Sequence, residues 1–377
     1  MMPWQESTQM SLRLEFCQQA MKPDRNMRQL CRRFNISAKT GYKWLARYQQ
    51  DGLTGLQDQS RRPHHSPTQT PKPMITTILA VRQQHTAWGG KKIYQYLKDQ
   101  GTPQLPHPNT ITRILKRHGC ITEAASQQAT PPKRFEQATP NACWQMDFKG
   151  HFQIDRGTCH PLDILDDHSH FCLCLQACED EQKETVKTRL ITVFQRYGLP
   201  QAMLMDNGPP WGYTAEHPYT QLAVWLMRLG IRVWHGRPGH PQTQGKLERF
   251  HRTLQVELLQ DRHFPTIAAC QAAFDQWRDC YNLERPHEGI DMQTPMTRFR
   301  PSPRSYPKAL PEVVYLDDDD IYRVNLNGMI QFKKRQVKVT RGLINERVAV
   351  RPLNTDGLFG IFYGSLKLRE INLNEAN

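Results

Sequence analysis

Three acidic residues that sit among apolar neighbours constrain this chain more than any other feature of its sequence. They are Asp147 in the run WQMDF, Asp206 in MLMDNG and Glu248 in GKLERFH. A buried charge without a partner is costly, so we expect the three carboxylates to share one site that cations neutralise. Hard Mg²⁺ takes oxygen ligands, and two such ions about 4 Å apart are a device for cutting and joining phosphodiesters.

Positive charge is concentrated in the first third of the chain. The 377 residues carry a net charge of +14. Residues 1–135 hold 21 basic and 7 acidic residues, which accounts for all of that excess, and the remainder holds 29 of each. A polyanionic partner is therefore expected. The distribution is typical of a nucleic-acid-binding region attached to a neutral catalytic one.

Cysteine usage and hydropathy indicate a reducing compartment. The ten cysteines form no CxxC pair, and we interpret the cluster Cys172, Cys174 and Cys178 as buried thiols rather than a metal site. The first residues do not resemble a signal peptide, and no apolar run approaches the roughly 20 residues of a membrane span. We expect a cytoplasmic protein without membrane association.

Residues 1–60 are predicted to form a helix-turn-helix DNA-binding domain. Asn35 suits a tight turn between two helices, and Ser37 can cap the second of them. One face of that second helix presents three basic residues at a spacing of four, namely Lys39, Lys43 and Arg47. Such a face is typical of a recognition helix in a major groove. A solvated basic face on a small bundle is the alternative interpretation.

A second helical DNA-binding domain, of the winged or helix-turn-helix type, is predicted over residues 72–120. Residues 61–71 form a basic linker with Arg61 and Arg62, of a kind that follows a phosphate backbone or a minor groove. The last predicted helix of the second domain begins near Pro108, ends at Gly119 and carries Arg113, Lys116 and Arg117. Two such domains in tandem can bind a longer site than either alone.

The rest of the chain changes character twice. Residues 121–140 are a linker rich in Ala, Gln, Thr and Pro. Strands followed by crossover helices over residues 141–300 predict a mixed sheet covered by helices. From 310 to 377 short apolar runs with the turn signals Asn327-Gly328 and Asp356-Gly357 predict a small all-β barrel. The predicted fold is therefore multidomain, all-α, then α/β, then all-β.

The spacing of the three acids fits one site. Asp206 follows Asp147 by 59 positions and Glu248 follows Asp206 by 42. An acid on a central strand, one at the end of a later strand and one on a helix can converge at the edge of a sheet. The alternative, three unrelated surface acids, fits poorly with their apolar neighbours.

These residues resemble the integrase-core D-D-E transposases of bacterial insertion sequences, a recombinase family with a ribonuclease-H-like fold. The matching text comprises WQMDF (144–148), LDDHS (165–169), DNGPP (206–210), GHPQTQGKLERFHRTL (239–254), YN (281–282), RPH (285–287) and TP (294–295). The long run around Glu248 is the most specific of these motifs. The resemblance extends over nearly the whole chain, because the family also has tandem helical domains and a small β region.

The resemblance implies a DNA-joining enzyme. Asp147, Asp206 and Glu248 would hold two Mg²⁺ ions, which Mn²⁺ can replace. The partners implied are double-stranded DNA, both the terminal repeats of a mobile element and a target, and a second copy of the chain, so at least a dimer on DNA. The location implied is the bacterial nucleoid. A metal-dependent nuclease that does not join, or a DNA-binding regulator with a dead core, are the competing functions.

Some residues near the motifs need separate weighing. Asp166 and Asp167 are expected to end a strand and orient a loop near Asp147 rather than to bind metal. Around Glu248, four residues are candidate DNA contacts: Lys246, Arg249, His251 and Arg252. Arg249 and Arg252 could equally be solvated charges, and His251 could instead meet a carboxylate close to the metal site. Three features depart from the family pattern: His170 where arginine is usual, His107-Pro108 before a helix, and 41 residues between Asp206 and Glu248.

Overall fold

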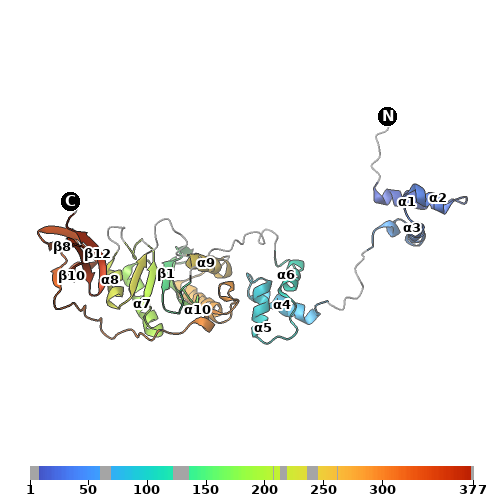
Figure 1. Ribbon diagram of the computed structural model, residues 1–377. Coiled ribbons are helices and arrows are strands. Elements are labelled where there is room, and N and C mark those ends of the chain that lie inside the picture. Colours follow the sequence, from blue (N-terminus) through green and yellow to red (C-terminus); the bar gives the residue numbers. More distant parts are fainter. Residues whose placement is uncertain are drawn as a thin grey trace. The chain divides into compact units, whose positions relative to one another are not determined.

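A computed structural model describes residues 8–59, 69–121, 136–206, 208–212, 219–235, 245–260 and 262–374. The chain divides into two compact units, Met1–Gln69 and Thr70–Asn377. Figure 1 shows the elements in order along the chain. No helix within the described ranges is long and apolar enough to cross a membrane.

The first unit is a small helical domain with the predicted turn. Its elements are α1 (Gln9–Ala20), α2 (Met27–Arg33), α3 (Ala38–Asp51) and the 3₁₀ helix η1 (Gly52–Leu56). Asn35 has a φ of 50°, which is the left-handed conformation predicted for the turn. The Ser37 hydroxyl accepts a hydrogen bond from the N–H of Thr40 and caps α3 as predicted. Phe16, Trp44 and Leu56 form part of the buried core.

The second helical region begins the second unit. It contains α4 (Lys72–Gln84), α5 (Gly90–Asp99) and α6 (Pro108–Arg117). Although His107 departs from the usual capping residues, its Nδ1 accepts from the N–H of Asn109, so it caps α6. Gly90 permits close packing of α5 on α6, because a Cβ there would lie 2.3 Å from Thr112 Oγ1.

A mixed six-stranded sheet forms the centre of the second unit (Figure 1). Its strands are β1 (Trp144–Phe148), β2 (Phe152–Ile154), β3 (Gly157–Asp166), β4 (Cys172–Cys178), β5 (Ala202–Met205) and β6 (Arg232–His235). The strands are hydrogen-bonded in the order β2-β3-β1-β5-β6, and β4 also pairs with β3. Pairing of β1 with β5 and of β5 with β6 is parallel, whereas β3 is antiparallel to its neighbours. The mixed sheet predicted from the sequence is confirmed.

Helices cover both faces of this sheet. One face packs against α7 (Lys183–Tyr197) and α8 (Gln221–Arg228) through a core that includes Trp144, Met146 and Met205. The other faces α9 (Gly245–Leu254), a π-helical turn η4 (Gln255–Leu259) and α10 (Ile267–Leu283). Because successive side chains of a strand point to opposite faces of the sheet, β3 and β4 contribute residues to both of these cores. The cysteines of β4 are buried, as predicted.

The second helical region packs against the core around one ion-pair cluster. Glu257 in η4 lies 3.0 Å from Arg285 Nε and 3.9 Å from Lys92 Nζ of α5. Cys280 of α10 also packs against the apolar core of the helical region. The 3₁₀ helix η5 (Glu288–Ile290) and helix α11 (Pro295–Arg298) follow.

The C-terminal region is antiparallel β structure. Its elements are β7 (Asp320–Arg323), β8 (Met329–Phe332), β9 (Arg335–Lys338), the 3₁₀ helix η6 (Arg341–Leu343), β10 (Arg347–Pro352), β11 (Leu358–Tyr363) and β12 (Leu366–Asn372). The sheet order is β12-β11-β10-β7, and β8 pairs with β9 in a separate hairpin. Since β7 and β12 have one partner each among the described strands, both are edges and their pairings do not close the predicted barrel. The hairpin turn is Lys333-Lys334, with φ of 44° and 64°, which the sequence does not signal.

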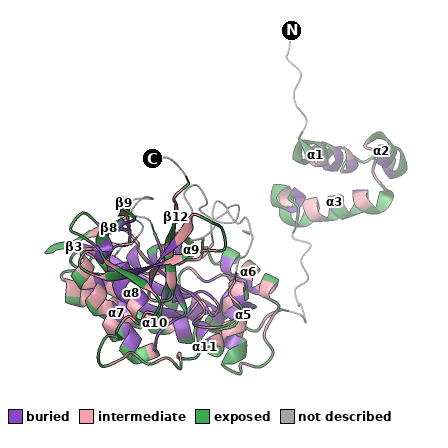
Figure 2. Cartoon of the chain, turned by 60° about the vertical axis from the view of Figure 1, so that its left-hand side comes forward, coloured by how far each residue is buried: buried purple, intermediate pink, exposed green. Residues whose placement is uncertain are grey.

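Helix α8 joins this region to the core. Leu222 and Trp225 pack on the central sheet, whereas Val224 and Met227 pack on the C-terminal strands. Every residue from Leu222 to Met227 is consequently buried (Figure 2). The Thr340 hydroxyl donates to the carbonyl of Tyr219 at 2.9 Å and fixes the contact. The C-terminal strands therefore pack against one side of α8, whose other side packs on the central sheet.

Candidate active site

Asp147 lies on β1, and Asp206 directly follows the neighbouring parallel strand β5. β1 pairs with β5 so that Trp144 is opposite Met203 and Gln145 is opposite Leu204, an offset of 59 positions. The two aspartates are separated by the same 59 positions, so continuing the register brings them opposite each other. Neighbouring residues in register project from the same face of a sheet. That face is the one covered by α9.

A third carboxylate, Asp163 on β3, extends this row and belongs to no motif noted in the sequence. It is the antiparallel partner of Asp147 and is completely buried. Its Oδ1 lies 2.7 Å from Nε2 of His251 on α9. Its Oδ2 has no hydrogen-bond partner in the described part of the chain. The signal was an acid inside an apolar strand, the same signal that marked Asp147.

The row of acids is electrostatically strained. Burial raises the pKa of Asp147 from 3.8 to about 6, and the charges of Asp163 and Asp206 act in the same direction. Burial also raises the pKa of Asp163, against the attraction of His251. For His251, burial would lower the pKa, but the charge of Asp163 and its hydrogen bond raise it overall. A bound cation would relieve this crowding of negative charge, and carboxylate oxygens are the donors that hard cations take.

Glu248 shares one side of helix α9 with His251, the residue that contacts Asp163 of β3. Glu248 is exposed in the first turn of α9 and lies one turn before His251, so both are on the same side of the helix. Because His251 is bonded to Asp163, this side of α9 is held toward β1 and β3. Arg249 and Arg252 are exposed on the same helix.

Lys246 fixes the start of α9 rather than standing free. Its Nζ lies 2.8 Å from Oδ1 of Asp167 and 2.7 Å from the carbonyl oxygen of the same residue. The ammonium group of Lys246, which was predicted to contact DNA, is therefore the group that forms this ion pair with Asp167. Residues 236–244, which include the first half of the motif before Glu248, lie outside the described residues.

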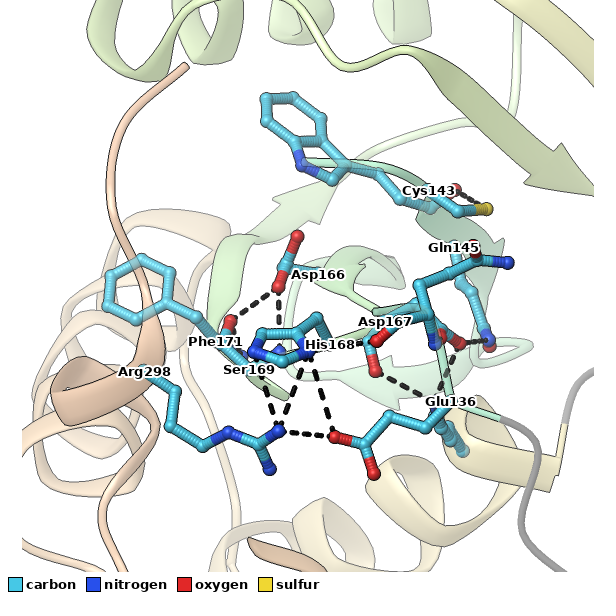
Figure 3. A network of polar contacts seen from close by, with 12 residues as sticks. Glu136, Cys143, Gln145, Asp166, Asp167, His168, Ser169, Phe171 and Arg298 are labelled. Carbon is cyan, nitrogen blue, oxygen red and sulfur yellow. Dashed lines mark hydrogen bonds and ion pairs between the residues drawn. The ribbon is translucent and has the colours of Figure 1, made fainter. Parts of the chain in front are cut away.

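Asp166 and Asp167 hold the loop after β3, as expected from the sequence (Figure 3). Asp166 accepts hydrogen bonds from the N–H and hydroxyl of Ser169 at 2.8 and 2.6 Å. Asp167 accepts from Nε2 of Gln145 at 2.6 Å, two residues before Asp147. Both carboxylates are thus engaged in hydrogen bonds within the protein. Their role in this structure is to orient the end of β3 against β1.

A second set of contacts in Figure 3 connects Glu136, which precedes β1, to the loop after β3. Arg298 of α11 donates to Glu136 at 2.5 Å and lies 3.4 Å from Nε2 of His168. His170, which replaces the usual arginine, has a φ of 61°. It lies against Gly289, where a Cβ would be 2.6 Å from its ring. The departure at His170 is therefore accommodated by a glycine far away in the sequence.

The predicted DNA-contacting residues of the helical regions lie on surfaces. Lys39 and Lys43 are exposed and Arg47 is partly exposed on α3. Three cations cover Trp44: Arg13, Lys43 and Arg47 lie 4.0, 4.5 and 5.2 Å from its ring. The sequence did not group Arg13 of α1 with the other two. On α6 the exposed bases are Arg113, Lys116 and Arg117. Arg61 and Arg62 lie outside the described residues.

Comparison with known proteins agrees with this architecture. Family models described as "Integrase core domain" match residues 137–241 and 229–295. The transposase for insertion sequence element IS904 of Lactococcus lactis subsp. lactis (strain IL1403) is 37% identical over 210 residues, which are 55% of this chain and 73% of that protein. The chain belongs to the integrase-core transposases of insertion sequences. As a member of this family it has the expected end regions: models of a helix-turn-helix domain, a homeodomain-like domain and an IS481 family transposase C-terminal domain match residues 12–64, 40–115 and 319–377.

Two further proteins are similar to this chain at lower sequence identity. The insertion element IS476 uncharacterized 39.2 kDa protein of Xanthomonas euvesicatoria is 24% identical over 243 residues, covering 62% of this transposase-family chain and 67% of that protein. Among solved structures, a simian T-cell lymphotropic virus intasome in complex with PP2A regulatory subunit B56 gamma is 17% identical. It covers 78% of this chain and 95% of that chain, with a TM-score of 0.38.

Proposed function

We propose that the chain is an active transposase that binds the terminal repeats of a mobile DNA element, cleaves the 3′ ends and joins them to target DNA. The observation that supports the proposal is the register of β1 and β5, whose offset of 59 positions equals the separation of Asp147 and Asp206 in the sequence. A regulator with a dead core has no need for crowded carboxylates. Burial, together with the charges of Asp163 and Asp206, raises the pKa of Asp147, so its ionised form costs stability unless a cation offsets it.

Asp147, Asp206 and Glu248 would hold two Mg²⁺ ions, with Mn²⁺ as a substitute. The donor set fits, since all three supply carboxylate oxygens and a hard cation prefers oxygen. Such ions, when bound, activate the attacking oxygen and stabilise the leaving 3′-oxygen of the DNA.

The chain's own residues position the acids. Asp163 and His251 join β3 to α9, and this bond sets the side of α9 that Glu248 shares. Lys246 bonded to Asp167 holds the first turn of the same helix. Arg249 and Arg252, exposed on the same helix as Glu248, would meet the phosphates of a DNA strand lying over the acids.

DNA recognition would reside in the two helical regions. Their net positive charge favours DNA on electrostatic grounds, and α3 and α6 present the basic residues Lys39, Lys43, Arg47, Arg113, Lys116 and Arg117. The linker residues Arg61 and Arg62 would add phosphate contacts. Joining two element ends in concert needs two sets of acids, so the working form would be at least a dimer on DNA, in the bacterial nucleoid.

A joining assay tests the proposal. The full chain is incubated with a labelled DNA end, a target plasmid and Mg²⁺, and the products are separated on a denaturing gel. Joined products are expected, and they should disappear with Asp147→Asn and in excess chelator. Cleaved ends without joined products would instead establish the nuclease function. Bound but uncut DNA under all metal conditions would establish a regulator.

A further inference from the structure

A second group of metal-ligating side chains lies between the second helical region and the core. His85, at the end of α4, faces Cys280 and Glu284 at the end of α10. Sγ of Cys280 lies 3.9 Å from Nδ1 of His85, and one ligand atom from each residue falls within 4.8 Å of the others. Cys280 and Glu284 are four positions apart, so they share one face at the end of the helix.

The chemistry of these donors fits zinc. Bond lengths of about 2.3 Å to sulfur and about 2.0 Å to nitrogen put the two ligand atoms of a tetrahedral zinc site roughly 3.5 Å apart. The observed 3.9 Å is close to that separation. A thiolate, an imidazole and a carboxylate form a borderline-soft set that Mg²⁺ does not favour. The group is therefore chemically distinct from the all-carboxylate row at Asp147.

The surroundings prepare the ligands. His85 is stacked on Trp88 with ring centroids 3.7 Å apart, which fixes the imidazole plane. A cavity of about 290 Å³ lined by His85, Cys280 and Glu257 adjoins the group and has room for water.

We propose that His85, Cys280 and Glu284 bind a zinc ion, with water as a fourth ligand, and that this ion fastens the second helical region to the core. On binding, the Cys280 thiol loses its proton to solvent as the zinc–sulfur bond forms, so no oxidant or reductant is needed. The ligands come from α4 and α10, so separating the two regions breaks the site. Zinc therefore stabilises the packed arrangement of these regions by mass action.

Cobalt(II) is the probe for the test, because a cobalt–thiolate bond gives a charge-transfer absorption that carboxylate sites cannot give. The full chain is titrated with cobalt(II) under reducing conditions. We expect one thiolate-bound ion per chain, displaced by zinc. The absorption should vanish in Cys280→Ser and persist in Cys120→Ser, a matched variant of a partly exposed thiol in the helical region. Absence of the band in the wild type, or its persistence in Cys280→Ser, would overturn the proposal.

A second measurement covers the case in which Cys280→Ser does not fold. His85→Gln and Glu284→Gln keep side-chain size, and each should weaken cobalt binding at least about tenfold. The rise in Tm that zinc produces should survive in a variant with Asp147→Asn and Glu248→Gln, and should be lost in His85→Gln. An equal rise in Tm with zinc in wild type and His85→Gln would refute the site, whatever the outcome of the joining assay.

Discussion

Nε2 of His251 lies 2.7 Å from Oδ1 of the completely buried Asp163, and this one bond connects the helix of Glu248 to the strand beside Asp147. An Asp163→Asn substitution should retain the shape of the contact but lose its charge. Residues that orient ligands typically contribute 10- to 100-fold to metal affinity or activity. We expect the Mg²⁺ concentration for half-maximal DNA cleavage to rise roughly tenfold.

Binding of DNA ends, measured by gel shift, should not change in Asp163→Asn. The matched control is Asp155→Asn, an exposed acid between β2 and β3. If Asp163→Asn and Asp155→Asn required the same Mg²⁺ concentration as wild type, the bond between Asp163 and His251 would have no part in the site.

Glu248→Gln preserves side-chain size and removes the charge proposed to hold a cation. End binding should survive, because it is placed in the helical regions. Cleavage and strand transfer should fall together by at least about 100-fold, since electrostatic stabilisation of the transition state is usually the largest contribution. Single-turnover assays with uncut and precut ends measure the two steps separately. Near-normal transfer of a precut end would show that another acid completes the site.

Asp147→Asn should stabilise the metal-free protein. The pKa of Asp147 is about 6 in the folded chain against 3.8 ordinarily, so at neutral pH its ionised form opposes folding. Removing that charge should raise the free energy of unfolding by about 3 kcal/mol, as 1 pKa unit is about 1.4 kcal/mol. Urea denaturation in chelator measures this. Addition of Mg²⁺ should stabilise wild type and not Asp147→Asn, and a wild type indifferent to Mg²⁺ would contradict the carboxylate site.

The cluster of Glu257, Arg285 and Lys92 should respond asymmetrically to substitution. Glu257→Gln leaves two cations without their shared anion, and breaking a buried pair in this way costs about 3 kcal/mol. Lys92→Met removes a cation that is costly to bury and should leave stability unchanged or slightly higher. Chemical denaturation at pH 7 compares the two. Equal losses for both variants would show that the cluster stabilises through Lys92 as much as through Glu257.

The same lysine predicts a pH dependence. Burial lowers the pKa of Lys92 from 10.5 to about 8 in the folded chain. Between pH 8 and 10.5 the unfolded chain therefore binds more protons, so the contribution of Lys92 to the free energy of unfolding rises with pH. The difference in stability between Lys92→Met and wild type should shrink over that range. A difference that does not change with pH would mean that Lys92 titrates normally.

Lys43→Ala should weaken binding to element ends. Lys43 is exposed on α3 and lies 4.5 Å from the Trp44 ring, so it is held in place on the proposed recognition helix. Loss of one phosphate contact should reduce the slope of log affinity against log salt by about 1. Fluorescence anisotropy at several salt concentrations measures this slope. Lys22→Ala, an exposed lysine outside α3, is the control, and an equal effect there would indicate only a general charge contribution.

Local sequence determined many of the helices, turns and strands of this protein and singled out its three candidate acids. Asn35 and Ser37 act within a few residues of their own positions, so their roles follow from backbone preference and capping alone. The acids at 147, 206 and 248 stand out because charge amid apolar residues is costly without a purpose. Even the register of β1 and β5 was visible as a 59-residue spacing, although only the sheet gave that spacing a meaning.

Only the tertiary structure decided which residues of different elements contact one another. Asp163 became part of the acid row through pairing of β3 with β1, and its bond to His251 spans 88 positions. His85 and Cys280 meet although they are 195 positions apart. Such contacts depend on which elements pack together. The packing free energy is spread over many apolar residues, so no single residue in the sequence reveals the arrangement. For the same reason the C-terminal strands were correctly expected from their pattern, but the pairings among the described strands do not show the predicted barrel, because strand pattern does not specify which strands pair.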